Sequence, residues 1–261
     1  MAEPWTLGPV LVTGGTGEIG LAIARAFLER GARAAVVGTR AERVQAARAS
    51  LASFGERVLE LAADLRTAAE VSRTIDAVES RVGTIAVLVN CAGINFNLAI
   101  DEVTEPDYDH LMATNLKSAF FASQLAGRRM IAAGIAGRIV NITSGNYRYA
   151  RPNAALYAAS KAALEMLTRS FAIELGAHGI TVNAVAPGLV ARAGERSPEF
   201  ARIADYYTAN SPLGRLVRPD DVAAAVAYLA SAQASGITGE TVVVDGGFSA
   251  GRYDFPRRSQ R

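Results

Sequence analysis

VLVTGGTGEIG, residues 10–20, is the stretch of sequence that decides the fold. Its first four residues predict a short buried strand, and Gly15, Gly17 and Gly20 follow in the spacing G-x-G-x-x-G. Glycine allows a tight turn and lets backbone N–H groups approach a pyrophosphate at the N-terminus of the helix expected from residue 18. In this strand–loop–helix context the motif predicts dinucleotide binding rather than an ordinary glycine-rich turn.

The rest of the chain repeats this alternation of short apolar runs and longer Ala- and Leu-rich stretches. We expect further strands at 34–38, 58–62, 85–90, 138–143, 181–185 and 241–244. We expect helices near 18–30, 41–54, 67–82, 102–133, 153–176 and 219–231. Strands that alternate with helices and are apolar throughout are typical of a buried parallel sheet, so the sequence predicts an α/β fold. No linker divides the chain, and we expect one domain over 1–250 and a basic tail over 251–261.

The composition excludes several classes of protein. Of the 261 residues 50% are hydrophobic, which is too much apolar surface for a disordered chain. The 27 basic and 25 acidic residues leave a net charge of +2, so no basic excess predicts nucleic-acid binding. The single cysteine excludes an internal disulfide, and with only two histidines we expect no metal site. Because no signal peptide or spanning segment is recognisable, we expect a soluble, cytoplasmic protein with no membrane partner.

Glycines and polar residues follow the predicted strands, which is where ligands bind in such sheets. After the second to the sixth strand come Thr39-Arg40, Asp64, Cys91-Ala92-Gly93, Ser144 and Pro187-Gly188. Because the carboxyl ends of parallel strands meet at one edge of a sheet, we expect the active site at this edge. We expect Cys91 itself to be a small buried apolar residue.

Thr39 and Arg40 bear on the choice of dinucleotide. An NAD-binding chain is expected to carry an acidic residue near the end of the second strand. Here Thr39 and Arg40 occupy that place. A carboxylate would repel a 2′-phosphate, whereas a guanidinium can pair with it, so the sequence favours NADP(H). NAD(H) stays open, because Arg40 can equally be a solvated residue at the start of a helix.

Tyr157 and Lys161 lie at i and i+4 of a predicted helix and therefore on one face. Lys161 is one of only two lysines among the 27 basic residues. A phenol close to a cation loses its proton more easily, and such a tyrosine can exchange a proton with a substrate oxygen. The spacing alone also fits an inert surface pair. A catalytic pair is favoured because Ser144 stands 13 residues before Tyr157, at the end of a predicted strand.

These residues combine with the other motifs into a recognisable set. Its members are residues 13–20, Asn90-Cys91-Ala92-Gly93, Asn115, Ser144, Tyr157-x-x-x-Lys161 and Pro187-Gly188. The set resembles the short-chain dehydrogenase/reductase family over about residues 8–250. The resemblance implies a single-domain Rossmann fold, with a doubly wound, mostly parallel seven-stranded sheet and helices on both faces. It also implies a homo-oligomer, most simply a homotetramer built from helix pairs.

The resemblance further implies a role for each motif residue. Tyr157 is expected as the general acid/base, Lys161 as the residue that holds the nicotinamide ribose and lowers the Tyr157 pKa, and Ser144 as the group that orients the substrate oxygen. Asn115 is expected to help hold a water relay to Lys161. The expected cofactor-binding residues are Gly14, Gly15, Thr16, Gly17, Glu18, Ile19, Gly20, Thr39, Arg40, Asp64, Leu65, Asn90, Ala92, Gly93, Tyr157, Lys161, Pro187 and Gly188.

Three features depart from the common pattern of the family, and one of them is that the glycine-rich loop lacks the basic residue often found there in NADP users. Glu18 stands where the short loop usually has glycine, and we expect its carboxylate to point away from a pyrophosphate, which it would repel. Arg192 stands where many relatives carry a threonine that holds the nicotinamide amide.

The predicted function is an NAD(P)-dependent oxidoreductase that moves a hydride between nicotinamide and a carbonyl or secondary alcohol. The sequence also predicts a small, polar substrate, either anionic or neutral. This prediction depends on the stretch 145–151, Asn95, Asn97 and a segment over 190–214 that we expect to be mobile. One alternative is a 3-oxoacyl (carrier-bound) reductase with a docking patch of Arg128, Arg129 and Arg169. The other is a cofactor-binding scaffold without catalysis.

Overall fold

The computed structural model describes residues 6–191, 193–195 and 197–251. Arg192 and all of the expected basic tail except Gly251 lie outside the described residues. Within them, no helix is long and apolar enough to cross a bilayer.

A single sheet of seven parallel strands forms the centre of the fold. The strands are β1 (Val10–Thr13), β2 (Ala34–Gly38), β3 (Val58–Ala62), β4 (Val87–Asn90), β5 (Arg138–Ile142), β6 (Thr181–Pro187) and β7 (Thr241–Val244). Their order is β3-β2-β1-β4-β5-β6-β7, and every pair is parallel. The chain thus winds outward in both directions from β1 and β4, and the point between them is where such sheets bind ligands. The predicted doubly wound Rossmann architecture is confirmed.

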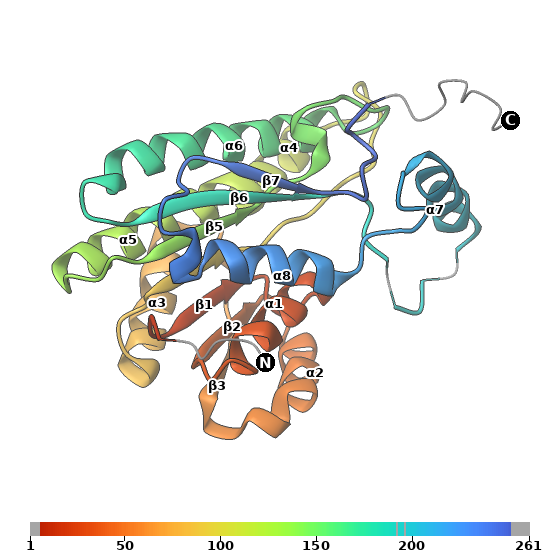
Figure 1. Cartoon of the computed structure of the whole chain (residues 1–261). Coiled ribbons are helices and arrows are strands. Elements are labelled where there is room, and N and C mark those ends of the chain that lie inside the picture. Colours follow the sequence, from red (N-terminus) through yellow and green to blue (C-terminus); the bar gives the residue numbers. More distant parts are fainter. Residues whose placement is uncertain (1–5, 192, 196, 252–261) are drawn as a thin grey trace, which may run out of the picture.

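Helices cover both faces of the sheet (Figure 1). They are α1 (Glu18–Leu28), α2 (Ala41–Leu51), α3 (Ala68–Val82), α4 (Glu105–Met112), α5 (Ser118–Ala132), α6 (Ala155–Gly176), α7 (Pro198–Asn210) and α8 (Pro219–Leu229). Buried residues of α1, α2 and α8 form one core, and those of α3, α5 and α6 form the other. Figure 1 shows α7 apart from these layers, beyond the carboxyl end of β6.

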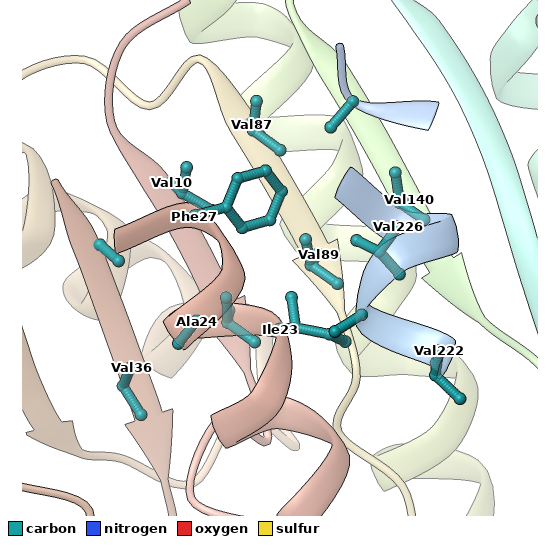
Figure 2. Packing of buried hydrophobic residues seen from close by; sticks show 14 of the residues in the cluster. Val10, Ile23, Ala24, Phe27, Val36, Val87, Val89, Val140, Val222 and Val226 are labelled. Atoms are coloured by element: carbon teal, nitrogen blue, oxygen red, sulfur yellow. The ribbon is translucent and has the colours of Figure 1, made fainter. Parts of the chain in front are cut away.

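The first core fixes α1, and with it the glycine loop, against the sheet. Phe27 and Ile23 of α1 are fully buried, together with Val222 and Val226 of α8. Figure 2 shows these side chains over the valines of the central strands, among them Val89. A buried side chain of this size contributes roughly 1.5–3 kcal/mol, so the helix that presents the loop is firmly held.

Two differences from the sequence prediction concern the site. The helix predicted over 102–133 is interrupted by a π-helical turn, Ala113–Lys117, between α4 and α5. This turn carries the buried Asn115, whose amide bonds to the backbone of Ile94, and π turns are frequent at functional sites. No helix was predicted within the segment 190–214, but the structure has α7 there, which Ser197 caps by accepting a hydrogen bond from the Phe200 N–H.

Candidate active site

The carboxyl edge of the sheet opens into a cavity of about 830 Å³, a volume typical of cofactor and ligand sites. Most of the predicted site residues line it. They are Gly14, Thr16, Gly17, Glu18, Ile19, Gly20, Thr39, Arg40, Asp64, Leu65, Ala92, Gly93, Ser144, Tyr157, Lys161, Pro187 and Gly188. The residues thus come from the ends of six strands and from α6 and meet in one place, as the sequence predicts.

Gly15, Asn90 and Asn115 are the predicted site residues that do not line the cavity. A Cβ on Gly15 would lie 2.7 Å from Val36 Cγ1, so this glycine allows the loop to pack on the sheet. The Asn90 amide donates to Ser123 Oγ and Asn141 Oδ1, at 2.9 and 2.8 Å. These residues support the wall of the cavity from behind.

The loop at the start of α1 fits the pyrophosphate of a dinucleotide. A Cβ on Gly14, whose φ is +62°, would lie 2.6 Å from Ala92 Cα, so packing and backbone geometry require glycine there. At Gly17 a Cβ would meet only Gly14 O, at 3.5 Å, so protein packing makes no such demand. Gly17 also begins α1 without a side-chain cap, which leaves the first N–H groups of the helix available to an anion.

Glu18 directs its carboxylate to another partner. Its Oε1 accepts a hydrogen bond of 2.8 Å from the backbone N–H of Ala193, in the loop after β6. This bond gives the carboxylate a fixed place and ties the glycine loop to the loop that leads to α7.

Ser144, Tyr157 and Lys161 line the same part of the cavity from β5 and α6. The Lys161 ammonium is buried and donates to the Ile142 carbonyl oxygen at 2.8 Å, and it lies 5.8 Å from the centroid of the Tyr157 ring. Ser144 follows the end of β5 and caps a short 3₁₀ turn, Gly145–Tyr147, by accepting from the Asn146 N–H. The strand end therefore positions both the hydroxyl and the ammonium.

The pKa of the Tyr157 phenol differs from the expectation. Burial raises the pKa of the Tyr157 phenol above its ordinary value, and the Ser144 hydroxyl and the charge of Arg151 oppose this rise. Burial also lowers the pKa of Lys161 to about 8. The prediction that the Lys161 ammonium lowers the phenol pKa is wrong for this structure, because loss of hydration dominates and the ammonium is directed at the Ile142 carbonyl.

Asn115 lies behind Gly93 and beside this pair. Its Nδ2 donates to Ile94 O at 2.9 Å and to Ser160 Oγ at 3.1 Å, and its Oδ1 accepts from the Ile94 N–H at 2.8 Å. A Cβ on Gly93 would lie 3.4 Å from Lys161 Nζ and 3.5 Å from Asn115 Oδ1, so both side chains border the same glycine. The Asn115 amide therefore holds the backbone of Ile94, next to Gly93, in place beside the Lys161 ammonium.

The adenosine end of the cavity holds more arginine than the motifs predict. Arg40 is half exposed and pairs loosely with Glu42, at 3.5 Å. Arg43, one turn further along α2, lines the cavity too and was missed, although its i+3 spacing from Arg40 could have indicated it. Arg66 also lines the cavity, and its Nε and Nη2 donate to Oδ1 and Oδ2 of Asp64, a bidentate pair that lowers the Asp64 pKa.

The substrate end is only partly as predicted. Of the stretch 145–151, Asn146 and Tyr149 line the cavity. Arg148 lines a separate hollow beside β7 instead. Arg151 does not line the cavity, and its guanidinium donates to Asn97 Oδ1 at 3.0 Å. Tyr207 of α7 also lines the cavity; it lies within the segment 190–214 that was expected at the substrate site, although no motif singled out this residue. Its ring stacks on Phe248, with centroids 4.3 Å apart.

Comparisons with known proteins agree with this geometry. The family model described as "Enoyl-(Acyl carrier protein) reductase" matches residues 15–249. Gluconate 5-dehydrogenase of Gluconobacter oxydans (strain 621H) is 33% identical over 240 residues, which cover 92% of this chain and 93% of that protein. Sorbitol dehydrogenase of Cereibacter sphaeroides is 37% identical over 250 residues, which cover 91% and 95%.

A solved structure shows the same fold. The crystal structure of a gluconate 5-dehydrogenase from Burkholderia cenocepacia J2315, in complex with NADP and tartrate, superposes with a TM-score of 0.87 and 33% sequence identity. The match covers 95% of this chain and 97% of that one. The chain therefore belongs to the short-chain dehydrogenase/reductase family and is an NAD(P)-dependent oxidoreductase that acts on CH–OH groups.

Proposed function

We propose that this enzyme interconverts a secondary alcohol and a ketone on a small polyol or sugar acid, with NADP(H) as cofactor and Ser144, Tyr157, Lys161 and Asn115 as the catalytic set. The observation that carries the proposal is the meeting of Ser144, Tyr157 and Lys161 in one cavity, with the ammonium buried. The bound nicotinamide supplies or accepts the hydride.

The protein's own groups handle the proton and the substrate oxygen. At neutral pH the Tyr157 phenol is protonated, which is the form that gives a proton to a carbonyl oxygen. Ser144, whose interaction with Tyr157 lowers the phenol pKa, would bind the same oxygen. Lys161 would hold the ribose hydroxyls, for which a compact ammonium is suited. Asn115 would keep Gly93 and Ile94 in place beside Lys161 and help hold a water relay to the ammonium.

Two of the three arginines that line the adenosine end support the choice of NADP(H). Arg40, Arg43 and Arg66 line the adenosine end, and Thr39 stands where a carboxylate would favour NAD(H). Arg66 is occupied by Asp64, so Arg40 and Arg43 are the residues that would pair with a 2′-phosphate.

Polar lining at the substrate end supports a hydroxylated substrate. Asn95, Ser144, Asn146, Tyr149 and Tyr207 all line the cavity. The relatives named above are dehydrogenases of gluconate and sorbitol, and the neighbouring structure holds tartrate, which is also a hydroxylated compound.

An acyl-carrier substrate is the second candidate, because the matching family model is described as a carrier-protein reductase. The expected docking arginines argue against it. Arg129 pairs with Asp76 at 2.6 Å, and Arg169 pairs with Glu165 at 3.0 Å. Acidic partners thus neutralise two of the three cations that would attract an acidic carrier protein.

A cytoplasmic location, a single domain over 1–250 and a homo-oligomer complete the proposal. Exposed apolar side chains on α6 support the last of these. Met166 is 58% exposed and Ile173 is 83% exposed, as suits a helix that packs against a second copy.

The test is a panel of D-sorbitol, D-gluconate, D-threitol, butane-2,3-diol, butan-2-ol and acetoacetyl-carrier protein, with NADP(H) and NAD(H) followed by absorbance. Turnover of hydroxylated substrates with NADP is the expected result. Turnover of the carrier-bound ketone alone would favour the second candidate, and no turnover of any alcohol or ketone would contradict both.

A further inference from the structure

Asn146 is a buried residue in the wall of the cavity that the proposed chemistry leaves unused. It is 9% exposed and lines the cavity two residues after Ser144. Four buried side-chain polar atoms have no hydrogen-bond partner in the part of the chain that the structure describes: Asn90 Oδ1, Arg138 Nε, Asn146 Nδ2 and Thr181 Oγ1. Of the residues that carry them, Asn146 is the one that lines the cavity.

The two ends of the Asn146 amide differ in their partners. The Ser144 hydroxyl donates a long, weak hydrogen bond of 3.4 Å to Asn146 Oδ1. Ser144 Oγ also accepts a hydrogen bond of 3.3 Å from the Asn146 backbone N–H. Nδ2 has no acceptor. A buried donor without an acceptor is costly, and one beside an active site calls for an explanation.

The position of the amide indicates which substrate atom would meet it. Ser144 is the group proposed to bind the reacting oxygen, and the Asn146 amide lies next to it, with Oδ1 at 3.4 Å from Ser144 Oγ. When Ser144 turns its hydroxyl to the substrate, the amide loses its weak partner and can rotate toward the cavity. A substrate hydroxyl suits either end of the amide, because it both donates and accepts.

We propose that Asn146 is a specificity-determining residue that binds the hydroxyl next to the reacting carbon, so that the enzyme selects vicinal diols and α-hydroxy ketones over simple secondary alcohols and ketones. The inference rests on the proposed function and narrows its substrate class. A site with a buried amide rejects an analogue that leaves the amide unpaired, because the cost of the unpaired group then persists in the complex.

The experiment compares butane-2,3-diol with butan-2-ol, which lacks only the neighbouring hydroxyl. The variants are Asn146→Leu, which keeps the size but not the hydrogen bonds, and Tyr147→Phe as the matched control. Tyr147 lies in the same 3₁₀ turn and does not line the cavity, so its variant loses one polar group without touching the substrate. For each enzyme kcat/KM is measured for both alcohols with NADP, together with the NADP Kd and the Tm.

We expect the parent and Tyr147→Phe to prefer the diol, and Asn146→Leu to lose about tenfold of that preference. The NADP Kd should change little in Asn146→Leu, and kcat/KM should fall for the diol and not for butan-2-ol. An equal loss for both alcohols would show that Asn146 only orients Ser144 and would overturn the inference. The inference would also be overturned if the parent enzyme showed no preference for the diol. The same holds if the parent oxidised neither compound while it oxidised other alcohols of the panel. Absence of turnover with every alcohol contradicts the proposed function itself, so the two failures are distinguishable.

Discussion

The Lys161 ammonium is held by the Ile142 carbonyl oxygen, at 2.8 Å, and not by the phenol of its helix neighbour Tyr157. Ile142 is the last residue of β5, and Ser144 follows it two residues later. The register of one buried strand therefore fixes the positions of the ammonium and of the serine hydroxyl relative to each other.

Burial of Lys161 should make the stability of the free protein depend on pH. The pKa of Lys161 is lowered to about 8 in the folded chain, against 10.5 ordinarily, so between these values the unfolded chain binds more protons. The free energy of unfolding should therefore rise with pH, by about 1 kcal/mol from pH 7 to 9, relative to Lys161→Met. Urea unfolding of both proteins at pH 7, 8 and 9 measures the difference.

The pH range of this comparison ends at pH 9, because above that pH the ionisation of Cys91 changes the free energy of unfolding in the opposite direction. Burial raises the pKa of the Cys91 thiol to about 11, so the unfolded chain loses that proton first and stability falls. If the stabilities of the parent and of Lys161→Met run parallel from pH 7 to 9, Lys161 is not the desolvated cation described above.

Lys161→Arg should lose most of the activity. A guanidinium keeps the positive charge, but it is larger and planar, and it would have to fit beside Gly93 in a space shaped for a compact ammonium. Because arginine stays charged at all accessible pH values, the basic limb of the pH–rate profile should shift as well. Steady-state rates between pH 6 and 10 are the measurement, and full activity with an unchanged profile would contradict the assigned role.

Replacing Thr39 by Asp and Arg40 by Ala should reverse the cofactor preference toward NAD. One charge-assisted hydrogen bond to a 2′-phosphate is worth about 1.5–3 kcal/mol, or roughly 10–100-fold in affinity. We expect the lower end, because Arg40 is 54% exposed and Glu42 competes for it. Titration of NADPH and NADH at two salt concentrations measures the effect.

Arg43→Ala should weaken NADPH binding by a similar factor and leave NADH binding unchanged. Arg48→Ala is the matched control, since Arg48 lies on the same helix and does not line the cavity. A parent that already prefers NADH would show that the arginines of α2 serve only as solvated charges.

Most of the fold could be predicted because the strands are short apolar runs, buried throughout in β1, β2, β4, β5 and β6 and partly buried in the edge strands β3 and β7. The apolar runs give β1, β2, β3 and β7 with their observed bounds, and β6 extends two residues further than predicted, to Pro187. The break between α4 and α5 was missed, because a π turn depends on the tertiary bonds of Asn115 to Ile94 and leaves the helical periodicity almost intact. α7 was missed although Ser197 and Pro198 are a helix-start signal.

The candidate site was predictable where a motif fixes the chemistry. Glycine spacing and the Tyr157–Lys161 pair identified residues that the fold does bring together. The pKa of Tyr157 was not predictable, because it depends on how much water the surrounding layers exclude. Tyr207 belongs to no motif and reaches the cavity only through the path of the loop after β6.

The role of Tyr157 in proton transfer is measured most directly by the turnover of Tyr157→Phe. This change keeps the packing of the ring and removes the one hydroxyl proposed to exchange the proton, so NADPH should bind with the affinity of the parent while kcat falls by about 10²–10⁴-fold. The measurement is single-turnover and steady-state reduction of the best ketone in the panel, with the NADPH Kd determined on the same protein. Collapse of turnover with NADPH binding retained is the expected result, and a kcat within a few-fold of the parent would contradict the role of Tyr157 in proton transfer.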